Sequence, residues 1–194
     1  MRILKYILLC VLTTCGNVQA VEQLGKQYLI SYGKEDASIK LVEYFSFQCP
    51  HCLKIFKNDF ARIKKEYIDT GKILFEFHPT PLDLPTLQAM VCLAQLDAHQ
   101  KQLFLEVMFE EAIPNEPELM AQCMIAAMGI FKKPLPLLDD HEFLKRQSAF
   151  NDAFVFLQQE EKVLAVPTAE INGKLFPKDV PDFKFVQNAA KKGL

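Results

Sequence analysis

The chain lacks tryptophan, a long apolar run and any large excess of one charge. With 22 Lys and Arg against 24 Asp and Glu, its net charge of −2 provides no basic surface, so we expect no nucleic-acid partner. The apolar run at residues 6–12 is too short to cross a bilayer. Sixteen phenylalanines supply the aromatic volume instead. The 194 residues, half of them apolar, suffice for one domain with a large core, or for a domain that carries an insertion.

A complete set of metal ligands is also missing from the sequence. Cys49 and Cys52 are spaced as CxxC, which can form half of a zinc site when a second pair follows at similar spacing. The other candidate ligands after the first twenty residues and outside this tetrapeptide stand apart from one another: Cys92, Cys123, His78, His99 and His141. We therefore expect no metal and no organic cofactor, and we interpret these three histidines as structural or solvated.

The first twenty residues are typical of a secretory signal. Arg2 and Lys5 give a positive start, residues 6–12 an apolar core, and Ala20 ends a small-residue cleavage site. Cys15 allows an alternative, lipoprotein anchoring, although Thr14 before it fits such a site poorly. In either case we expect export to the periplasm or a similar compartment in which disulfides persist.

The chain is organised around the tetrapeptide Cys49-Pro50-His51-Cys52, which follows an apolar strand pattern at residues 39–45. In the first turn of a helix, residues i and i+3 lie on one face, so the two cysteines can form a disulfide. Pro50 suits the first helical position. Free N–H groups and the helix dipole then favour a thiolate at Cys49, and His51 can add a donor or a positive charge.

The size of this effect decides the direction of the chemistry. If the pKa of Cys49 falls from ~8.5 to ~4, the reduced form gains roughly 4 kcal/mol at pH 7. For two electrons this moves the potential by ~90 mV in the oxidising direction. Because the pKa is lowered, the gain disappears as the pH falls through the lowered value. Such a site gives its disulfide away; a purely structural disulfide is the alternative.

Hydrophobic patterning predicts an α/β fold. Strands are expected at residues 27–32, 39–45 and 73–77, with a helix from Pro50 to about Thr70 between the second and third, which favours a parallel crossover. From residue 81 to 162 only helical patterns follow. Asn172-Gly173 then predicts a tight hairpin between strands at residues 168–171 and 174–176, and Asp182 can cap a last helix.

These features together resemble the DsbA-like branch of the thioredoxin superfamily over nearly the whole mature chain. Residues 47–52, Phe-Gln-Cys-Pro-His-Cys, are similar to the active-site signature, and Val166-Pro167-Thr168 is similar to the cis-proline loop. The resemblance implies a thioredoxin fold, a central mixed β-sheet flanked by helices with an all-helical insertion. We expect a signal at residues 1–20, a thioredoxin-like domain at 21–80 and 163–194, and the insertion at 81–162.

The resemblance also implies roles for individual residues. Cys49 is expected to be the exposed nucleophile, Cys52 its buried partner, and His51 a group that stabilises the thiolate. Pro167 would be cis and lie opposite the dithiol, with the Val166 backbone free to pair with an extended substrate strand. The expected substrate-binding surface consists of Val166, Pro167, Thr168 and Phe47.

Glu43 shares a strand face with Leu41 and Phe45, so we expect it to point inward. A carboxyl group beneath Cys52 would have a raised pKa and could carry the proton of that thiol during exchange. The alternative is a strand glutamate that turns to solvent.

Cys92 and Cys123 are predicted on separate helices of the insertion. As free thiols they would be ordinary small core residues. In an oxidising compartment they could instead form a structural disulfide, closing a loop of about thirty residues for roughly 3 kcal/mol. We favour the disulfide, because leftover cysteines in an exported protein usually pair.

The sequence therefore predicts an exported, monomeric thiol:disulfide oxidoreductase that oxidises reduced or unfolded exported proteins through a mixed disulfide at Cys49. By resemblance, a DsbB-like membrane protein would reoxidise it. Two alternatives remain open. One is an isomerase or reductase of the same fold, and the other is a binding module in which the apolar surface around Phe47 and the Val166-Pro167 loop holds unfolded chains.

Overall fold

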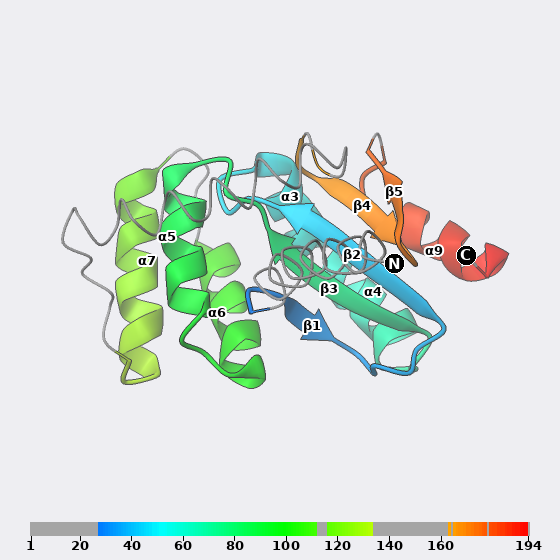
Figure 1. The fold of residues 1–194 in the computed structure, drawn as a ribbon, viewed down its shortest axis with the longest axis horizontal. Helices are drawn as coiled ribbons and strands as arrows, with labels where there is room; N and C mark the ends of the chain where they lie inside the picture. Colours follow the sequence, from blue (N-terminus) through cyan, green and yellow to red (C-terminus); the bar gives the residue numbers. More distant parts are fainter. Residues whose placement is uncertain (1–26, 112–115, 134–162, 164, 178, 194) are drawn as a thin grey trace, which may run out of the picture.

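The structure is a computed structural model that describes residues 27–111, 116–133, 163, 165–177 and 179–193 (Figure 1). The predicted signal at residues 1–20, with Cys15, lies outside the described residues. So do residues 134–162 of the predicted helical insertion. None of the helices within the described ranges is long and apolar enough to span a membrane.

The described strands form one mixed sheet with the order β1-β3-β2-β4-β5, which confirms the predicted central β-sheet. β2 and β3 are parallel, as the crossover pattern predicted, and the other neighbours are antiparallel. The strands are β1 (Ile30–Tyr32), β2 (Ile39–Phe45), β3 (Ile73–Pro79), β4 (Thr168–Ile171) and β5 (Lys174–Phe176). β3 runs two residues beyond its predicted end, since its pairing with β2 continues to Pro79.

β2 lies in the middle of the sheet because its sequence, IKLVEYF, is apolar on both faces apart from Lys40 and Glu43. Every β2 residue except Lys40 is buried. At the end of β2, Tyr44 pairs with His78 on one side and with Thr168 on the other. The sheet therefore places the start of β4 beside the segment that leads from β2 to the dithiol.

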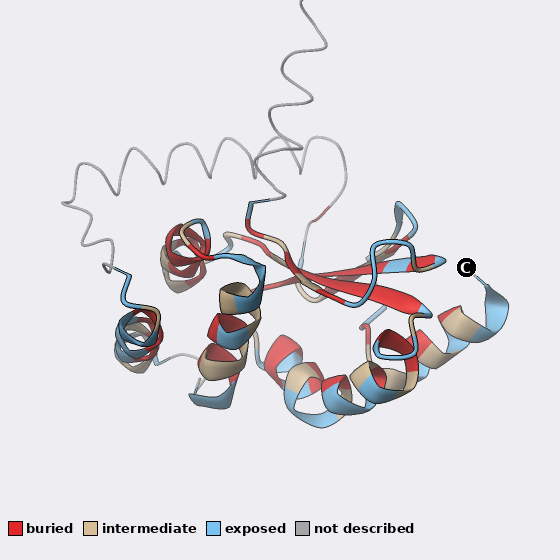
Figure 2. Ribbon diagram, turned by 90° about the horizontal axis from the view of Figure 1, so that it is seen from below, coloured by how far each residue is buried: buried red, intermediate tan, exposed pale blue. Residues whose placement is uncertain are grey.

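A long helical segment follows the dithiol and lies with the C-terminal helix α9 (Phe183–Lys192) on one face of the sheet (Figure 2). It comprises α3 (Pro50–Ile55), η1 (Phe56–Phe60), α4 (Ala61–Ile63) and η2 (Lys64–Ile68), the two η segments being π-helical. The side chains of Leu53, Phe60 and Ile63 on this segment are buried. The segment stops before Gly71, whose φ of +74° is left-handed.

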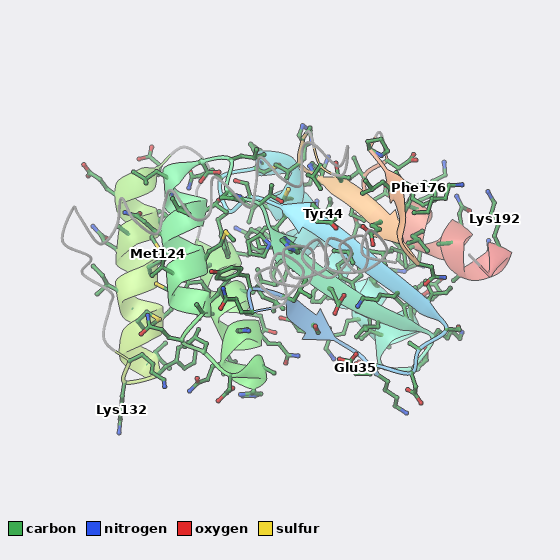
Figure 3. All side chains as sticks on the ribbon, viewed as in Figure 1. Glu35, Tyr44, Met124, Lys132, Phe176 and Lys192 are labelled. Carbon is green, nitrogen blue, oxygen red and sulfur yellow. The ribbon has the colours of Figure 1, made fainter. Side chains whose placement is uncertain are left out.

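Among the described residues, three further helices stand beside the sheet, in the region predicted to be helical (Figure 1). They are α5 (Leu84–Leu93), α6 (Ala98–Glu111) and α7 (Pro117–Ile130). Figure 3 labels one residue in each part: Met124 lies on α7 among these helices, and Tyr44 lies on β2 in the sheet. Aromatic side chains pack between these helices and the sheet, since the ring centroid of Phe109 on α6 lies 5.5 Å from that of Phe45 at the end of β2.

The C-terminal hairpin and helix form as the sequence predicted. Asn172 and Gly173 connect β4 to β5 with φ angles of +50° and +84°, which a two-residue turn of this kind requires. Asp182 caps α9, since its carboxylate accepts a hydrogen bond of 2.8 Å from the Phe185 N–H.

Candidate active site

Cys49 lies at the N-cap of α3, where the helix has N–H groups without partners in its own first turn. The Cys52 N–H points at the Cys49 sulfur, at a donor–acceptor distance of 3.4 Å. Cys49 is half-buried and Pro50 and His51 are exposed, whereas Cys52 is only 1% exposed. The helix start thus presents one sulfur toward the surface and holds the other in the core.

The pKa of Cys49 is lowered from 9.0 to about 6. The largest cause is a hydrogen bond from the Cys52 thiol, followed by the backbone N–H groups of Cys52 and His51 and the charge of His51, while burial opposes the shift. The direction agrees with the sequence prediction, but the value lies above the ~4 assumed there. With solvent screening at this half-exposed sulfur, the reduced form gains about 1 kcal/mol at pH 7.

The pKa of Cys52 shifts the opposite way, because burial, the hydrogen bond to Cys49 and the charge of Glu43 all oppose ionisation. Both cysteines are free thiols, so the structure represents the reduced dithiol. In the described part of the chain, no three His, Cys, Asp or Glu side chains gather closely enough to hold a metal ion.

Glu43 is fully buried on β2, as its position on the strand predicted. Neither carboxyl oxygen has a hydrogen-bond partner among the described residues. Burial is the main cause that raises its pKa well above the ordinary value, and the negative charge of Cys49 adds to it. The raised pKa favours the protonated form of Glu43, and this carboxyl group interacts electrostatically with both Cys49 and Cys52.

The loop before β4 faces the dithiol. The Val166–Pro167 peptide bond is cis, as the resemblance implied. The Cys49 thiol donates to the Val166 carbonyl over 3.8 Å, and Val166 and Pro167 are half-buried. Thr168, however, is only 1% exposed, and its hydroxyl donates to the Ala165 carbonyl at 2.7 Å. The Thr168 side chain therefore fastens the loop from within and does not face outward, and the substrate-binding role of position 168 stays a prediction.

The substrate-binding role predicted for Phe47 is also wrong. This side chain is 0% exposed, and its ring centroid lies 4.9 Å from that of Phe45 and 5.5 Å from that of Phe109. Phe47 follows the strand directly and turns into the aromatic core instead of facing outward. The buried Phe47 ring offers no surface to an unfolded chain, so a binding module would rest on the partly exposed Val166–Pro167 loop alone.

Three residues near the dithiol were missed by the sequence analysis: Ser46, Asp83 and Thr86. Asp83 caps α5, and the Asp-Leu-Pro sequence could have shown this, since Pro suits the first turn of a helix. Its second hydrogen bond, from the Ser46 hydroxyl, joins positions 37 residues apart and has no sequence signal. Gln48 also reaches across to α7, where its side-chain N–H contacts the Met120 sulfur at 2.8 Å.

Cys92 on α5 and Cys123 on α7 are buried in the same apolar cluster, and the two helices pack together. Burial raises the pKa of Cys92 to about 12, and burial with the charge of Glu111 raises that of Cys123. They are free thiols in this structure, in which Cys49 and Cys52 are also unbonded. Their pairing stays a prediction.

Comparisons with known proteins agree with this geometry. A family model described as thioredoxin matches residues 26–187. A probable disulfide bond formation protein D of Bacillus cereus is 28% identical over 176 residues, which cover 84% of this chain and 78% of the relative. Oxidised BdbD from Bacillus subtilis superposes with a TM-score of 0.66 at 24% identity, covering 87% of this chain and 93% of BdbD. Wolbachia pipientis alpha-DsbA1 gives 0.62 at 24% identity, covering 84% and 89%. These structures share the fold of this chain.

Proposed function

The chain belongs to the thioredoxin family, and we propose that it donates its Cys49–Cys52 disulfide to reduced proteins. Its class of activity is that of a protein disulfide oxidoreductase, in agreement with relatives named disulfide bond formation proteins. The single observation that supports the direction of transfer is the unequal ionisation of the dithiol, in which one thiol has a pKa of about 6 and the other has a raised pKa.

In the first step, a substrate thiolate attacks the Cys49 sulfur of the oxidised protein. A mixed disulfide forms between substrate and Cys49, the Cys49–Cys52 bond breaks, and its electron pair leaves with the Cys52 sulfur. Because the pKa of Cys52 is raised, this sulfur needs a proton as it leaves. In this proposal Glu43, which is fully buried and whose raised pKa favours the protonated form, supplies that proton.

In the second step, another substrate thiolate attacks the substrate sulfur of the mixed disulfide. A substrate disulfide forms, and Cys49 leaves as a thiolate. Its lowered pKa makes it a good leaving group at neutral pH, which favours this step. Over the two steps, two electrons pass from the substrate dithiol to Cys49 and Cys52, and the protein ends in the reduced form that the structure represents.

The surface around the dithiol suits an extended substrate. Val166 and Pro167 lie partly exposed next to the Cys49 sulfur, and a backbone at this place can pair with a strand of substrate. In this proposal the substrates are reduced or unfolded exported proteins, reached after removal of the signal at residues 1–20. A DsbB-like membrane protein would accept the two electrons and restore the disulfide.

The equilibrium of the dithiol with glutathione tests this proposal, because it orders oxidant, isomerase and reductase on one scale. We expect a mildly reducing glutathione buffer to reduce the protein, and the oxidised protein to introduce disulfides into a reduced, unfolded substrate. Cys49→Ser should abolish both reactions. An oxidised protein that survives this buffer intact would rule out the donor role and leave a reductase.

A further inference from the structure

Three successive backbone N–H groups lie between β2 and the sulfur of Cys49, and each has a defined acceptor. The Phe47 N–H donates to the Thr86 hydroxyl oxygen at 3.0 Å. The Gln48 N–H donates to the Ser46 hydroxyl oxygen at 2.9 Å, and the Cys49 N–H donates to the Ser46 carbonyl at 3.1 Å. The backbone that carries Cys49 to the start of α3 is therefore held by two hydroxyl side chains and one carbonyl.

The hydroxyl groups of Thr86 and Ser46 form a chain of hydrogen bonds in which each donates to the next acceptor. The Thr86 hydroxyl donates to the Ser46 oxygen at 3.2 Å, and the Ser46 hydroxyl donates to the carboxylate of Asp83. Thr86 is 0% exposed and Ser46 is 3% exposed, so neither can exchange a lost partner for bulk water. Each hydroxyl has one proton, and its direction is set by the next acceptor.

The chain of hydrogen bonds ends at Asp83, whose carboxylate can only accept. One oxygen takes the Ser46 hydroxyl, and the other takes the Thr86 N–H at 2.7 Å, which also caps α5. Asp83 thus sets the donor-to-acceptor direction of the whole series of hydrogen bonds, which runs from the Phe47 N–H through the Thr86 and Ser46 hydroxyl groups to the carboxylate. A donor in place of either carboxylate oxygen would reverse part of it.

We propose that Asp83, Thr86 and Ser46 are positioning residues, which hold residues 47–49 so that the Cys49 sulfur faces the N–H groups at the start of α3. They thereby set how readily the dithiol gives up its disulfide, an inference that rests on the proposed function. Asp83 and Thr86 are not among the groups that bond to the reacting sulfurs, so they act through the backbone. The Ser46 backbone N–H does bond to the Cys52 sulfur and acts to lower its pKa, while the Ser46 hydroxyl holds the Gln48 N–H. In this way α5, which lies in the predicted insertion, takes part in the chemistry of a site on the thioredoxin-like sheet.

Thr86→Val is the first test, since valine keeps the shape of threonine and removes the hydroxyl. The Phe47 N–H loses its acceptor, and the loop must shift to satisfy it. We expect the midpoint of the Cys49 thiolate titration, followed by ultraviolet absorbance, to rise by about one pH unit. The equilibrium constant with glutathione should shift about tenfold toward the disulfide form. Thr86→Ser restores the hydroxyl, so the midpoint of its thiolate titration and its equilibrium constant with glutathione should both return close to the wild-type values.

Asp83→Asn is the second test and decides the matter if Thr86→Val does not fold. Asparagine is as good an N-cap as aspartate, so α5 keeps its start. Its amide nitrogen, however, faces the Ser46 hydroxyl as a donor and opposes this donor-to-acceptor direction. The midpoint of the thiolate titration and the equilibrium constant with glutathione should both move in the same direction as in Thr86→Val. Asp182→Asn is the matched control, since Asp182 caps α9 through an equivalent bond of 2.8 Å far along the chain from the dithiol.

If Asp83→Asn, or a folded Thr86→Val, loses stability while thiolate titration and glutathione equilibrium stay at the wild-type values, the three residues are only structural and the proposal fails. The thiolate titration needs no substrate. It therefore reports on positioning even if the wild-type protein proves unable to oxidise proteins, and the two proposals can fail separately.

Discussion

Cys49 and Cys52 are three residues apart, yet burial and hydrogen bonding move their pKa values in opposite directions. Cys49 accepts hydrogen bonds at the start of α3, which stabilise its thiolate. Cys52, one turn later, is enclosed in the core, where a charge is costly. Disulfide exchange at such a pair depends on a proton for the buried sulfur, and Glu43 is the ionisable side chain that acts on both cysteines electrostatically.

Glu43→Gln should slow disulfide exchange about tenfold or more near neutral pH, because glutamine cannot transfer a proton to Cys52. The pH dependence that comes from the carboxyl group should disappear with it. Stopped-flow reduction of the oxidised protein by a thiol, followed over a range of pH, measures both effects. Glu76→Gln is the control, since Glu76 is also buried but pairs with Lys40 at 2.9 Å and lies on β3. Equal rates and pH profiles for Glu43→Gln and wild type would remove the proton-transfer role.

At the scale of elements, the end of β2 brings together segments that are distant in the sequence. It pairs with β3 and β4, so the loop at Val166 comes to face Cys49. α5 approaches from the side and holds Ser46 and Phe47 through its first turn. The hairpin of β4 and β5 keeps β4 in register with β2, since Leu41 pairs with Ile171 next to the turn.

Gly173→Ala should reduce the free energy of unfolding by about 1 kcal/mol, because its φ of +84° is unfavourable for a residue with a side chain. No atom of the described residues lies within 4 Å of the position that an added Cβ would take, so the expected cost comes from the backbone. Denaturant unfolding measures it. The glutathione equilibrium should not change, since the turn lies at the far end of β4 from Val166. A redox shift in this variant would show that hairpin stability controls the site.

For the whole molecule, the two redox states should differ in stability. The reduced form contains an ionised Cys49 whose pKa is lowered from 9.0 to about 6 by the folded structure. The oxidised form has no thiol at Cys49 that can ionise, whereas we expect Glu43 and most of the core to be the same in the oxidised and reduced forms. A protein that is more stable when reduced returns readily to that state and so releases its disulfide.

The stability advantage of the reduced form should therefore depend on pH. Because the folded pKa of Cys49 is lowered, the thiolate contribution is fully present above about 9, decreases as the pH falls, and is lost below about 6. Parallel denaturant unfolding of reduced and oxidised protein between about pH 5 and 7 measures it, with a change of about 1 kcal/mol expected after solvent screening. Cys49→Ser should lack this pH dependence. A difference independent of pH would contradict the lowered pKa.

The sequence by itself determined the elements whose signals are local. The apolar β2 pattern, the Asn172-Gly173 turn and the Asp182 cap each depend on a few neighbouring residues, and all three form as predicted. The spacing of Cys49 and Cys52 on one helix turn likewise depends only on helix geometry.

Only the tertiary structure decided which side chains face the dithiol. Phe47 turns into the core because rings from β2 and α6 surround it, and no local pattern reports their position. The bond between Ser46 and Asp83 joins a strand end to a distant helix start, so it exists only once both have packed. The pKa of Cys49 is lowered to about 6 chiefly by the hydrogen bond from the Cys52 thiol, and the half-burial of the Cys49 sulfur, which only folding decides, opposes a larger shift.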